Sequence, residues 1–277
     1  MAQTTNNLKL AYIFSAIIIV LATTASAGGL LIENLYRDNL WTTSQWRGND
    51  IVTLGIAVPI LIGAVILAAR GSQRAQLIWM AITHYMLYNF AFYLFAAAFN
   101  RFFLIYVALF ALSILTCIFA LPHIDVKGIS QRFQDRTPAK AIAGYLLLVA
   151  VCLGGLWIGQ AVSATISGQT PQVILDSGHP TNVVSAIDLS LLVPFFILGG
   201  IWLWQRRPWG YILGTIMTLS SATYTLALGT MSLTADKTVV AGAETLTPLW
   251  FSLSIMSLIA FLFLICNIAP VQSKPSP

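Results

Sequence analysis

The sequence predicts an all-α integral membrane protein with eight transmembrane helices, arranged as two parallel four-helix repeats with both termini in the cytoplasm. Hydrophobic residues make up 58% of the chain, charged residues only 8%, and the mean hydropathy is +0.83. Soluble domains carry about a quarter charged residues. The apolar residues also fall in blocks of about 20, which is the length of a helix that crosses a hydrocarbon core of ~30 Å.

The apolar blocks define the expected spans. They are residues 10–31, 51–69, 77–99, 101–122, 141–165, 184–204, 209–232 and 249–269. Only Asn100 and Arg101 separate the third block from the fourth, which predicts a tight turn, and a kinked continuous helix there would reduce the count to seven.

The first span has a second interpretation. Lys9, the apolar run 10–21 and the small residues 25–27 also fit a secretory signal with its cleavage site. The run stays apolar through Leu31, longer than the apolar part of such a signal, and this favours an uncleaved first helix.

The Lys and Arg residues set the expected orientation through the positive-inside rule. With a cytoplasmic amino end, ten of the fourteen fall on the cytoplasmic side: Lys9, Arg70, Arg74, Lys127, Arg132, Arg136, Lys140, Arg206, Arg207 and Lys274. The other four are Arg37, Arg47, Arg101 and Lys237. The net charge of +5 therefore reflects topology rather than nucleic-acid binding, and a bacterial inner (plasma) membrane is the expected location.

An internal duplication links the second span to the sixth at one offset of 135 residues. The matched pairs are Leu54 with Leu189, Val58 with Val193, Pro59 with Pro194, Ile62 with Ile197 and Ile66 with Ile201. The match predicts one four-helix unit in residues 1–135 and a second in 136–277, related by an axis along the membrane normal. Chance matches between apolar segments are the alternative.

Pro59 and Pro194 are expected to kink their helices at matching depths, because proline removes a backbone hydrogen bond and crowds the preceding turn. Paired interrupted helices indicate binding sites in transporters. Static kinks, which membrane helices tolerate, are the other interpretation.

Polar residues near the centres of the third and seventh spans form one candidate binding site. These residues are His84, Tyr88, Asn89 and Tyr224. Lipid cannot satisfy their hydrogen bonds, so their faces should turn inward, either to hydrogen-bond between helices or to line a wet cavity. His84 favours the cavity, because an imidazole can exchange protons near neutral pH.

A second candidate group lies at the outer end of the sixth span, where His179 and Asn182 precede Asp188. A carboxylate inside a span is expected to face the interior with a donor nearby. His179, Asn182 and an outer arginine are the expected donors. The alternative makes His179 a loop residue and Asn182 a helix cap.

The outer segment 33–50 is expected to be a long loop in which Trp41 and Trp46 rest on the lipid headgroups as an aromatic belt, with a ligand-binding loop as the alternative. Three cysteines, Cys117, Cys152 and Cys266, lie within spans without paired spacing and are interpreted as packing residues. The sequence contains no motif of a nucleotide-driven pump, a familiar membrane protease or a metal site. No cofactor, no metal and no catalytic residue is therefore predicted.

The stretch from His179 to Asp188, with Pro194 and the run 206–211, resembles sequences in multi-pass bacterial inner-membrane proteins of unassigned function. The resemblance covers about 35 of the 277 residues and implies no activity.

Three functions remain open at this point. The first is a carrier or channel-like protein that passes a small solute or protons between the two units. The second is a non-catalytic membrane subunit, sensor or assembly factor that binds a membrane protein partner or the lipid bilayer. The third is an intramembrane enzyme using His179 and Asp188 as acid and base, and an enzyme is less favoured than a binding protein.

Overall fold

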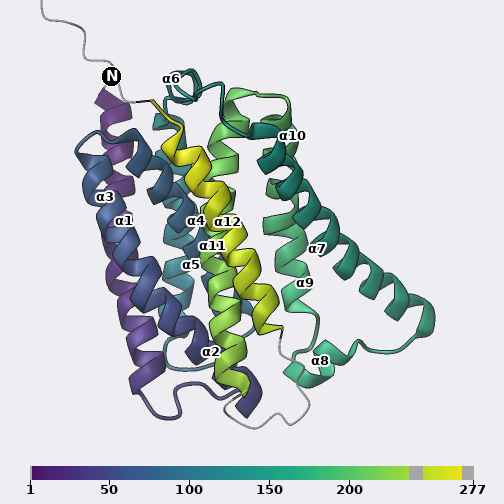
Figure 1. Ribbon diagram of the computed structural model, residues 1–277. Helices are drawn as coiled ribbons and strands as arrows, with labels where there is room; N and C mark the ends of the chain where they lie inside the picture. The colour runs from purple at the N-terminus through teal and green to yellow at the C-terminus, as the bar shows by residue number, and fades with distance from the viewer. Residues whose placement is uncertain (1, 237–245, 270–277) are drawn as a thin grey trace, which may run out of the picture.

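The computed structural model describes residues 2–236 and 246–269, and every element in this part of the chain is a helix (Figure 1). The α-helices are α1 (Ala2–Leu31), α2 (Leu40–Val52), α3 (Val58–Ala69), α4 (Gln73–Phe95), α5 (Phe103–Ala120), α6 (Val126–Ser130), α7 (Ala139–Ser167), α8 (Gln172–Ser177), α9 (Val183–Ile187), α10 (Val193–Trp204), α11 (Pro208–Asp236) and α12 (Thr247–Cys266). Two π-helical segments, η1 (Thr53–Ala57) and η3 (Asp188–Leu192), and a 3₁₀ turn, η2 (Leu121–His123), join some of them.

Seven helices of the described part are long and apolar enough to cross a membrane, so the chain is a polytopic α-helical protein by length and composition. They are Asn7–Leu31, Leu40–Ala69, Phe103–His123, Ala139–Ser167, Val183–Trp204, Pro208–Ala235 and Thr247–Cys266. The expected third span corresponds to α4, whose 23 residues reach from one end of the bundle to the other but include many polar side chains. The count of eight spans therefore stays a prediction.

The connections alternate between the two ends of the bundle. In Figure 1 the start of α1, the turns 70–72 and 205–207, the segment 121–138 and the end of α12 lie at the upper end. The expected cytoplasmic cations of these connections thus share one end. The orientation of that end toward the cytoplasm remains a prediction, and Lys237, Glu244, Lys274 and the carboxyl terminus lie outside the described residues.

Several of these cations bind backbone carbonyls at the end of α12. Arg74 donates a hydrogen bond to the carbonyl of Ile268, and Arg132 Nη1 donates to the carbonyl of Ala269 at 3.2 Å. Phe133 and Ile268 form an isolated antiparallel bridge between the same two segments. The segment between the two proposed units is thereby attached to the last helix at the upper end.

Helices α4 and α11 form the centre of the bundle. α4 packs against α3, α5 and α11, whereas α11 packs against α2, α4, α10 and α12. The apolar window of α11 is 78% buried, compared with 28% for that of α7. The two most polar of the long helices are therefore the most enclosed, as expected if the outer helices shield their side chains from lipid.

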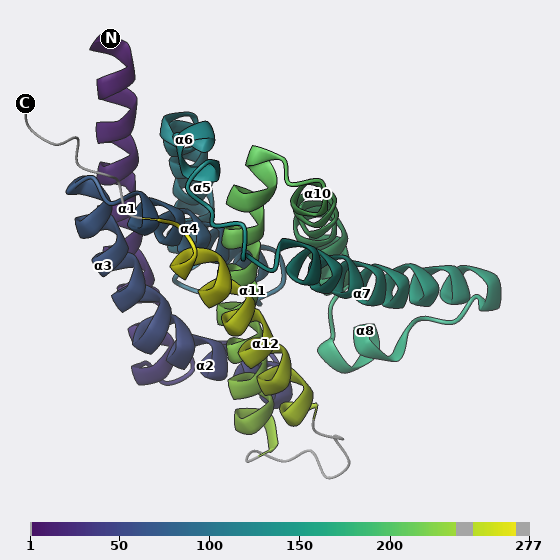
Figure 2. The same ribbon diagram turned by 45° about the horizontal axis from the view of Figure 1, so that its top comes forward.

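Helix α7 leaves the bundle, and both views show its far end and α8 projecting away from the other helices (Figures 1 and 2). Its packing partner is α10, whereas the matching helix of the first unit, α1, packs against α2, α3 and α5. The two proposed units thus differ in helix packing, and the repeat stays a prediction.

The segment 33–50 differs from the expected loop. Residues 40–52 form α2, which continues through η1 into α3 as one 30-residue stretch. Asn39 caps α2, because its side-chain oxygen accepts a hydrogen bond from the Thr42 backbone N–H at 2.8 Å. Trp46 is buried at 5% exposure rather than resting on headgroups, so the aromatic-belt interpretation is wrong for this residue. The burial follows from the helix, which turns Trp46 toward α4.

Both proline helices contain a π-helical segment directly before the Val-Pro pair. η1 precedes Val58-Pro59 and η3 precedes Val193-Pro194, and in each the valine N–H bonds the carbonyl five residues earlier. In a regular α-helix the proline ring clashes with the carbonyl four residues before it, and a wider turn relieves this contact. The two segments are separated by the same offset of 135 residues that relates the sequences.

Candidate functional site

Asp188 lies at the start of η3 and is buried at 4% exposure. Tyr88 of α4 donates its hydroxyl hydrogen to Asp188 Oδ1, and Trp157 Nε1 of α7 donates to Oδ2 at 2.7 Å. Asp188 thus faces the interior with donors in reach, as the sequence predicts. Tyr88 belongs to the other candidate group and Trp157 was not expected, so the choice of His179, Asn182 or an outer arginine as donor was wrong.

The Tyr88 ring is itself held by two aromatic neighbours. It meets the Tyr224 ring of α11 edge to face with centroids 4.5 Å apart, and the Phe92 ring in the same manner at 5.0 Å. Such edge-to-face pairs fix the orientation of a ring. Tyr88, Tyr224 and Asp188, three of the predicted residues, therefore form one group where α4, α11 and η3 meet.

A second buried carboxylate, Asp50 of α2, lies at the end of the segment 33–50, which was expected to be an outer loop. It is only 1% exposed, and it accepts hydrogen bonds from Tyr36 at 2.6 Å and from Tyr93 at 2.9 Å. Gly29 lets the backbone of α1 approach the Asp50 carboxylate, because a Cβ at this position would lie 1.9 Å from Asp50 Oδ2. Trp46, Asp50 and Thr53, at helical spacing, form the signal in the sequence that could have identified this site.

Tyr36 lies between α1 and α2, outside the candidate spans. Burial raises the pKa of its hydroxyl well above the usual value, and the Asp50 charge raises it further. Tyr36 therefore remains protonated near neutral pH and can serve as a donor to Asp50.

A chain of buried amides and hydroxyls lies between α2, η1 and α4. Asn49 Nδ2 donates to Asn89 Oδ1 at 2.5 Å, and Asn89 Nδ2 donates to Thr53 Oγ1 at 3.4 Å. Tyr85 Oη lies 2.9 Å from Thr53 Oγ1 and donates to Asn49 Oδ1 at 3.3 Å. These four residues satisfy one another, so predicted Asn89 acts here as an interhelical hydrogen-bonding residue.

His84 lies near the middle of α4 and connects to α11. Its Nδ1 is 2.8 Å from Ser220 Oγ, while its buried Nε2 has no hydrogen-bond partner in the described part of the chain. The Phe195 ring meets the imidazole edge to face at 6.0 Å. None of the hydrogen bonds that His84 makes to described residues reaches Asp188, so His84 lies outside the network that joins Tyr88 to Asp188.

Four threonine hydroxyls of α11 neither bond to another helix nor need a wet cavity. Thr215, Thr218, Thr223 and Thr225 each donate to the backbone carbonyl four residues earlier in the same helix. Such bonds satisfy a hydroxyl without a partner helix or water. Ser221 of α11 is different, because its Oγ accepts a hydrogen bond from Ser257 Oγ of α12 at 3.1 Å, and Ser257 Oγ also lies 2.6 Å from Tyr145 Oη of α7.

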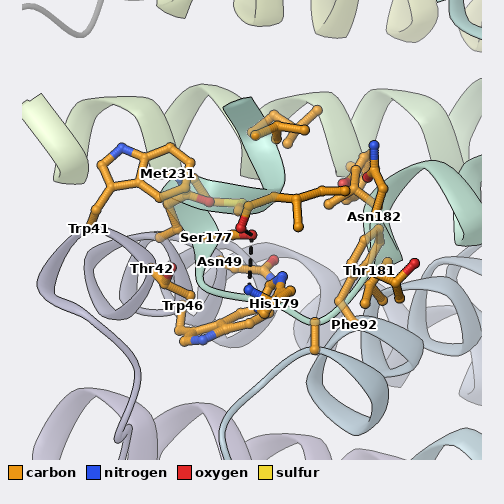
Figure 3. A pocket seen from close by; sticks show the side chains of 18 residues that line it. Trp41, Thr42, Trp46, Asn49, Phe92, Ser177, His179, Thr181, Asn182 and Met231 are labelled. Carbon is orange, nitrogen blue, oxygen red and sulfur yellow. Dashed lines mark hydrogen bonds between the residues drawn. The ribbon is translucent and has the colours of Figure 1, made fainter. Parts of the chain in front are cut away.

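A pocket of about 150 Å³ opens between α2, α4, α8, α9 and α11 (Figure 3), and α2 and α8 lie at the end of the bundle opposite the N-terminus (Figure 1). Its lining includes predicted His179, Asn182 and Tyr224, together with Trp41, Trp46, Asn49 and Phe92. The structure thus brings His179 and Asn182 to one mouth. Asp188 is not among the lining residues and lies behind the Tyr224 and Tyr88 rings.

Asn182 is also the amino-terminal cap of α9. Its Oδ1 accepts a hydrogen bond from the Ser185 N–H at 3.0 Å, and its Nδ2 donates to Gln160 Oε1 at 2.7 Å. The helix-cap alternative is therefore confirmed. His179 remains the less constrained of the two, because its buried Nε2 has no partner among the described residues.

Comparison of the chain with protein-family models, with curated proteins and with solved structures found no match in any of the three.

Proposed function

We propose that the protein is a carrier or channel-like protein that admits a small solute through the pocket at the outer end and moves a proton at Asp188. One observation carries the proposal. The pocket between α2, α4, α8, α9 and α11 is backed by Tyr224, whose ring meets that of Tyr88, and Tyr88 donates its hydroxyl hydrogen to a buried carboxylate.

The environment of Asp188 supports proton binding. Both of its hydrogen-bonding partners in the described part are neutral, and a buried carboxylate without a cation costs several kcal/mol when charged. Protonation removes that cost. Carboxylates held in this way inside spans are typical of proton relays in pumps and transporters.

The position of Asp188 supports a linkage between protonation of its carboxylate and the conformation of the π-helical turn η3. Asp188 begins η3, and its backbone carbonyl accepts the i→i−5 bond from Val193. π-Helical turns are frequent at functional sites, and interrupted helices in matching positions indicate transporter binding sites. A change in the charge of Asp188 would act directly on this turn.

The experiment is proton entry into proteoliposomes that contain the purified protein and an entrapped pH-sensitive dye, driven by a potassium diffusion potential. We expect faster entry than in protein-free vesicles and loss of the difference in Asp188→Asn, which keeps shape but cannot bind a proton. Asp176→Asn is the matched control, since Asp176 is an exposed carboxylate at the same end. Equal rates in wild-type and protein-free vesicles would overturn the proposal.

A second candidate, a non-catalytic subunit or sensor, is favoured by the outer half of α7. This half projects from the bundle (Figure 2). It exposes the apolar side chains Leu156, Ile158, Val162 and Ile166. Lipid or a partner helix would cover them. Vesicles without proton flux that still bind a ligand at the pocket would favour this candidate. Acid–base catalysis by His179 and Asp188 has no such support, because only His179 lines the pocket.

A further inference from the structure

We propose that the outer pocket binds a small uncharged ring compound that carries one hydroxyl or carbonyl group. The inference deepens the proposed function by naming the ligand class, but it does not require transport. The argument rests on the charge of the lining, on two polar atoms that lack partners, and on the size and aromatic character of the cavity.

No described residue of the lining is Asp, Glu, Lys or Arg. The nearby Asp38 carboxylate is already engaged, since Oδ2 accepts from Trp46 Nε1 at 3.1 Å and Oδ1 accepts from the Ala98 N–H at 3.0 Å. A charged ligand would lose its hydration here without gaining an ion pair, which costs several kcal/mol. The lining therefore selects an uncharged ligand.

Two lining residues have a buried polar atom that no described group satisfies, Thr42 Oγ1 and His179 Nε2. Thr42 is 4% exposed, so bulk water does not solvate its hydroxyl. A buried donor or acceptor left unpaired costs about 1–3 kcal/mol. A ligand hydroxyl both donates and accepts, and can offset this cost at either atom.

The other polar side chains of the lining include Gln45 and Thr181, which are not buried, and two buried or half-buried amides that are already bonded. Asn49 is bonded to Asn89 and Tyr85, and Asn182 is bonded to Gln160 and the α9 backbone. In Figure 3 the side chain of His179 points into the group of lining side chains, on the segment that joins α8 to α9. Thr42 and His179 are the lining residues with a buried unpaired atom, so they would gain most from orienting the ligand.

The rest of the lining matches a flat apolar body. Trp41, Trp46, Phe92 and Tyr224 supply aromatic surface, and Leu228 and Met231 supply aliphatic and thioether surface. A volume of about 150 Å³ is that of a cavity known to hold benzene. Aromatic rings prefer such edge-to-face and stacked surroundings. A single six-membered ring with one polar substituent fits both the volume and the polarity.

The test uses phenol as the probe and measures its binding to the purified full-length protein by isothermal titration calorimetry. Benzoate, which has a similar ring but a negative charge, and toluene, which lacks the hydroxyl, are the comparison compounds. We expect saturable phenol binding at one site, toluene bound about threefold to tenfold more weakly, and benzoate not bound. Binding of benzoate as tight as that of phenol would overturn the inference.

Variants assign the binding to this pocket. Thr42→Val should weaken the binding of phenol about threefold to tenfold and leave the binding of toluene unchanged, since only the hydroxyl contact is lost. Thr83→Val is the matched control, because Thr83 also has a buried unpartnered hydroxyl but does not line the pocket.

Val173→Phe, on the half-exposed α8, should fill the pocket and abolish phenol binding with little risk to folding. Unchanged phenol binding in both Thr42→Val and Val173→Phe would contradict the assignment.

The outcomes separate this inference from the proposed function. Phenol binding without proton flux would retain the ligand class and overturn the carrier proposal. Proton flux that depends on Asp188, without phenol binding, would support the carrier and overturn the ligand class.

Discussion

Tyr88 and Tyr93, five residues apart on α4, donate hydrogen bonds to carboxylates on two different proline helices. Tyr88 binds Asp188 in the second proposed unit, whereas Tyr93 binds Asp50 in the first. One helix therefore donates a hydrogen bond to a buried carboxylate in each of the two proposed units. Both contacts are buried, so each should contribute more to stability than an exposed hydrogen bond.

The Tyr88–Asp188 contact can be measured by a double-mutant cycle. Tyr88→Phe removes the donor and should destabilise the protein by about 1–3 kcal/mol, because it leaves one carboxylate oxygen unsatisfied. Combined with Asp188→Asn, the effects should be non-additive by at least ~0.5 kcal/mol. Thermal unfolding in detergent provides the readout.

The matched control for this cycle pairs Tyr93→Phe with Asp188→Asn. Tyr93 binds Asp50 and not Asp188, so these two changes should be additive within ~0.5 kcal/mol. Equal coupling free energies in both cycles would show that the coupling reflects general destabilisation of the protein rather than a specific hydrogen bond.

Much of the helical architecture could be predicted from the sequence, because lipid imposes a length and a composition on each outer helix. α4 shows the limit of this signal. Its polar side chains lower the hydropathy, yet a helix enclosed by others needs no apolar surface toward lipid. The seven apolar helices were therefore recognisable by composition, while the count of eight depends on the path of α4.

The candidate site was only partly predictable, because its contacts join residues far apart in the sequence. Asp188 was identified as an interior carboxylate, but its donor Trp157 lies on α7, and no local pattern indicates that α7 packs there. Asp50 was missed because its span was taken to begin at residue 51, whereas the capped helix α2 begins at Leu40. A polar sequence at 40–50 resembles a loop, and burial against α1 and α11 overrides that local preference.

Gly29→Ala should be among the most disruptive small substitutions in the protein. The added methyl group would lie 1.9 Å from Asp50 Oδ2 and 2.3 Å from Tyr36 Oη, so the carboxylate would have to leave its hydroxyl donors. We expect a marked loss of folded yield and of detergent thermostability. Gly159→Ala is the control, since nothing lies within 4 Å of its Cβ position, and it should be neutral or stabilising. A neutral Gly29→Ala would show that α1 and α2 are not in close contact.

Cysteine accessibility tests the topology. In a background without Cys117, Cys152 and Cys266, a single cysteine at Gln169 should react with a membrane-impermeant maleimide added to intact cells, and one at Lys127 should react only after lysis. The two residues lie at opposite ends of the described bundle. Labelling of both positions, or of neither, in intact cells would contradict the predicted arrangement, in which the ends of α7 lie on opposite sides of the membrane.

Pro194→Ala tests whether the π-helical turn holds Asp188 in place. Alanine restores an N–H at position 194 and removes the ring that would clash with the Ser190 carbonyl, so the turn can tighten to α-helical hydrogen bonding. Such a change removes one extra residue from the turn and rotates Asp188 relative to α10 by roughly 100°, at 3.6 residues per turn. Asp188 would then face away from Tyr88.

We expect slower hydrogen exchange in residues 188–194 of Pro194→Ala, because the i→i−4 bonds form, together with loss of the Asp188-dependent proton flux. Pro248→Ala serves as the control, since Pro248 lies in the first turn of α12, where proline needs no wider turn. Unchanged exchange and flux in Pro194→Ala would mean that packing against α7 and α11, rather than the proline, determines the position of Asp188.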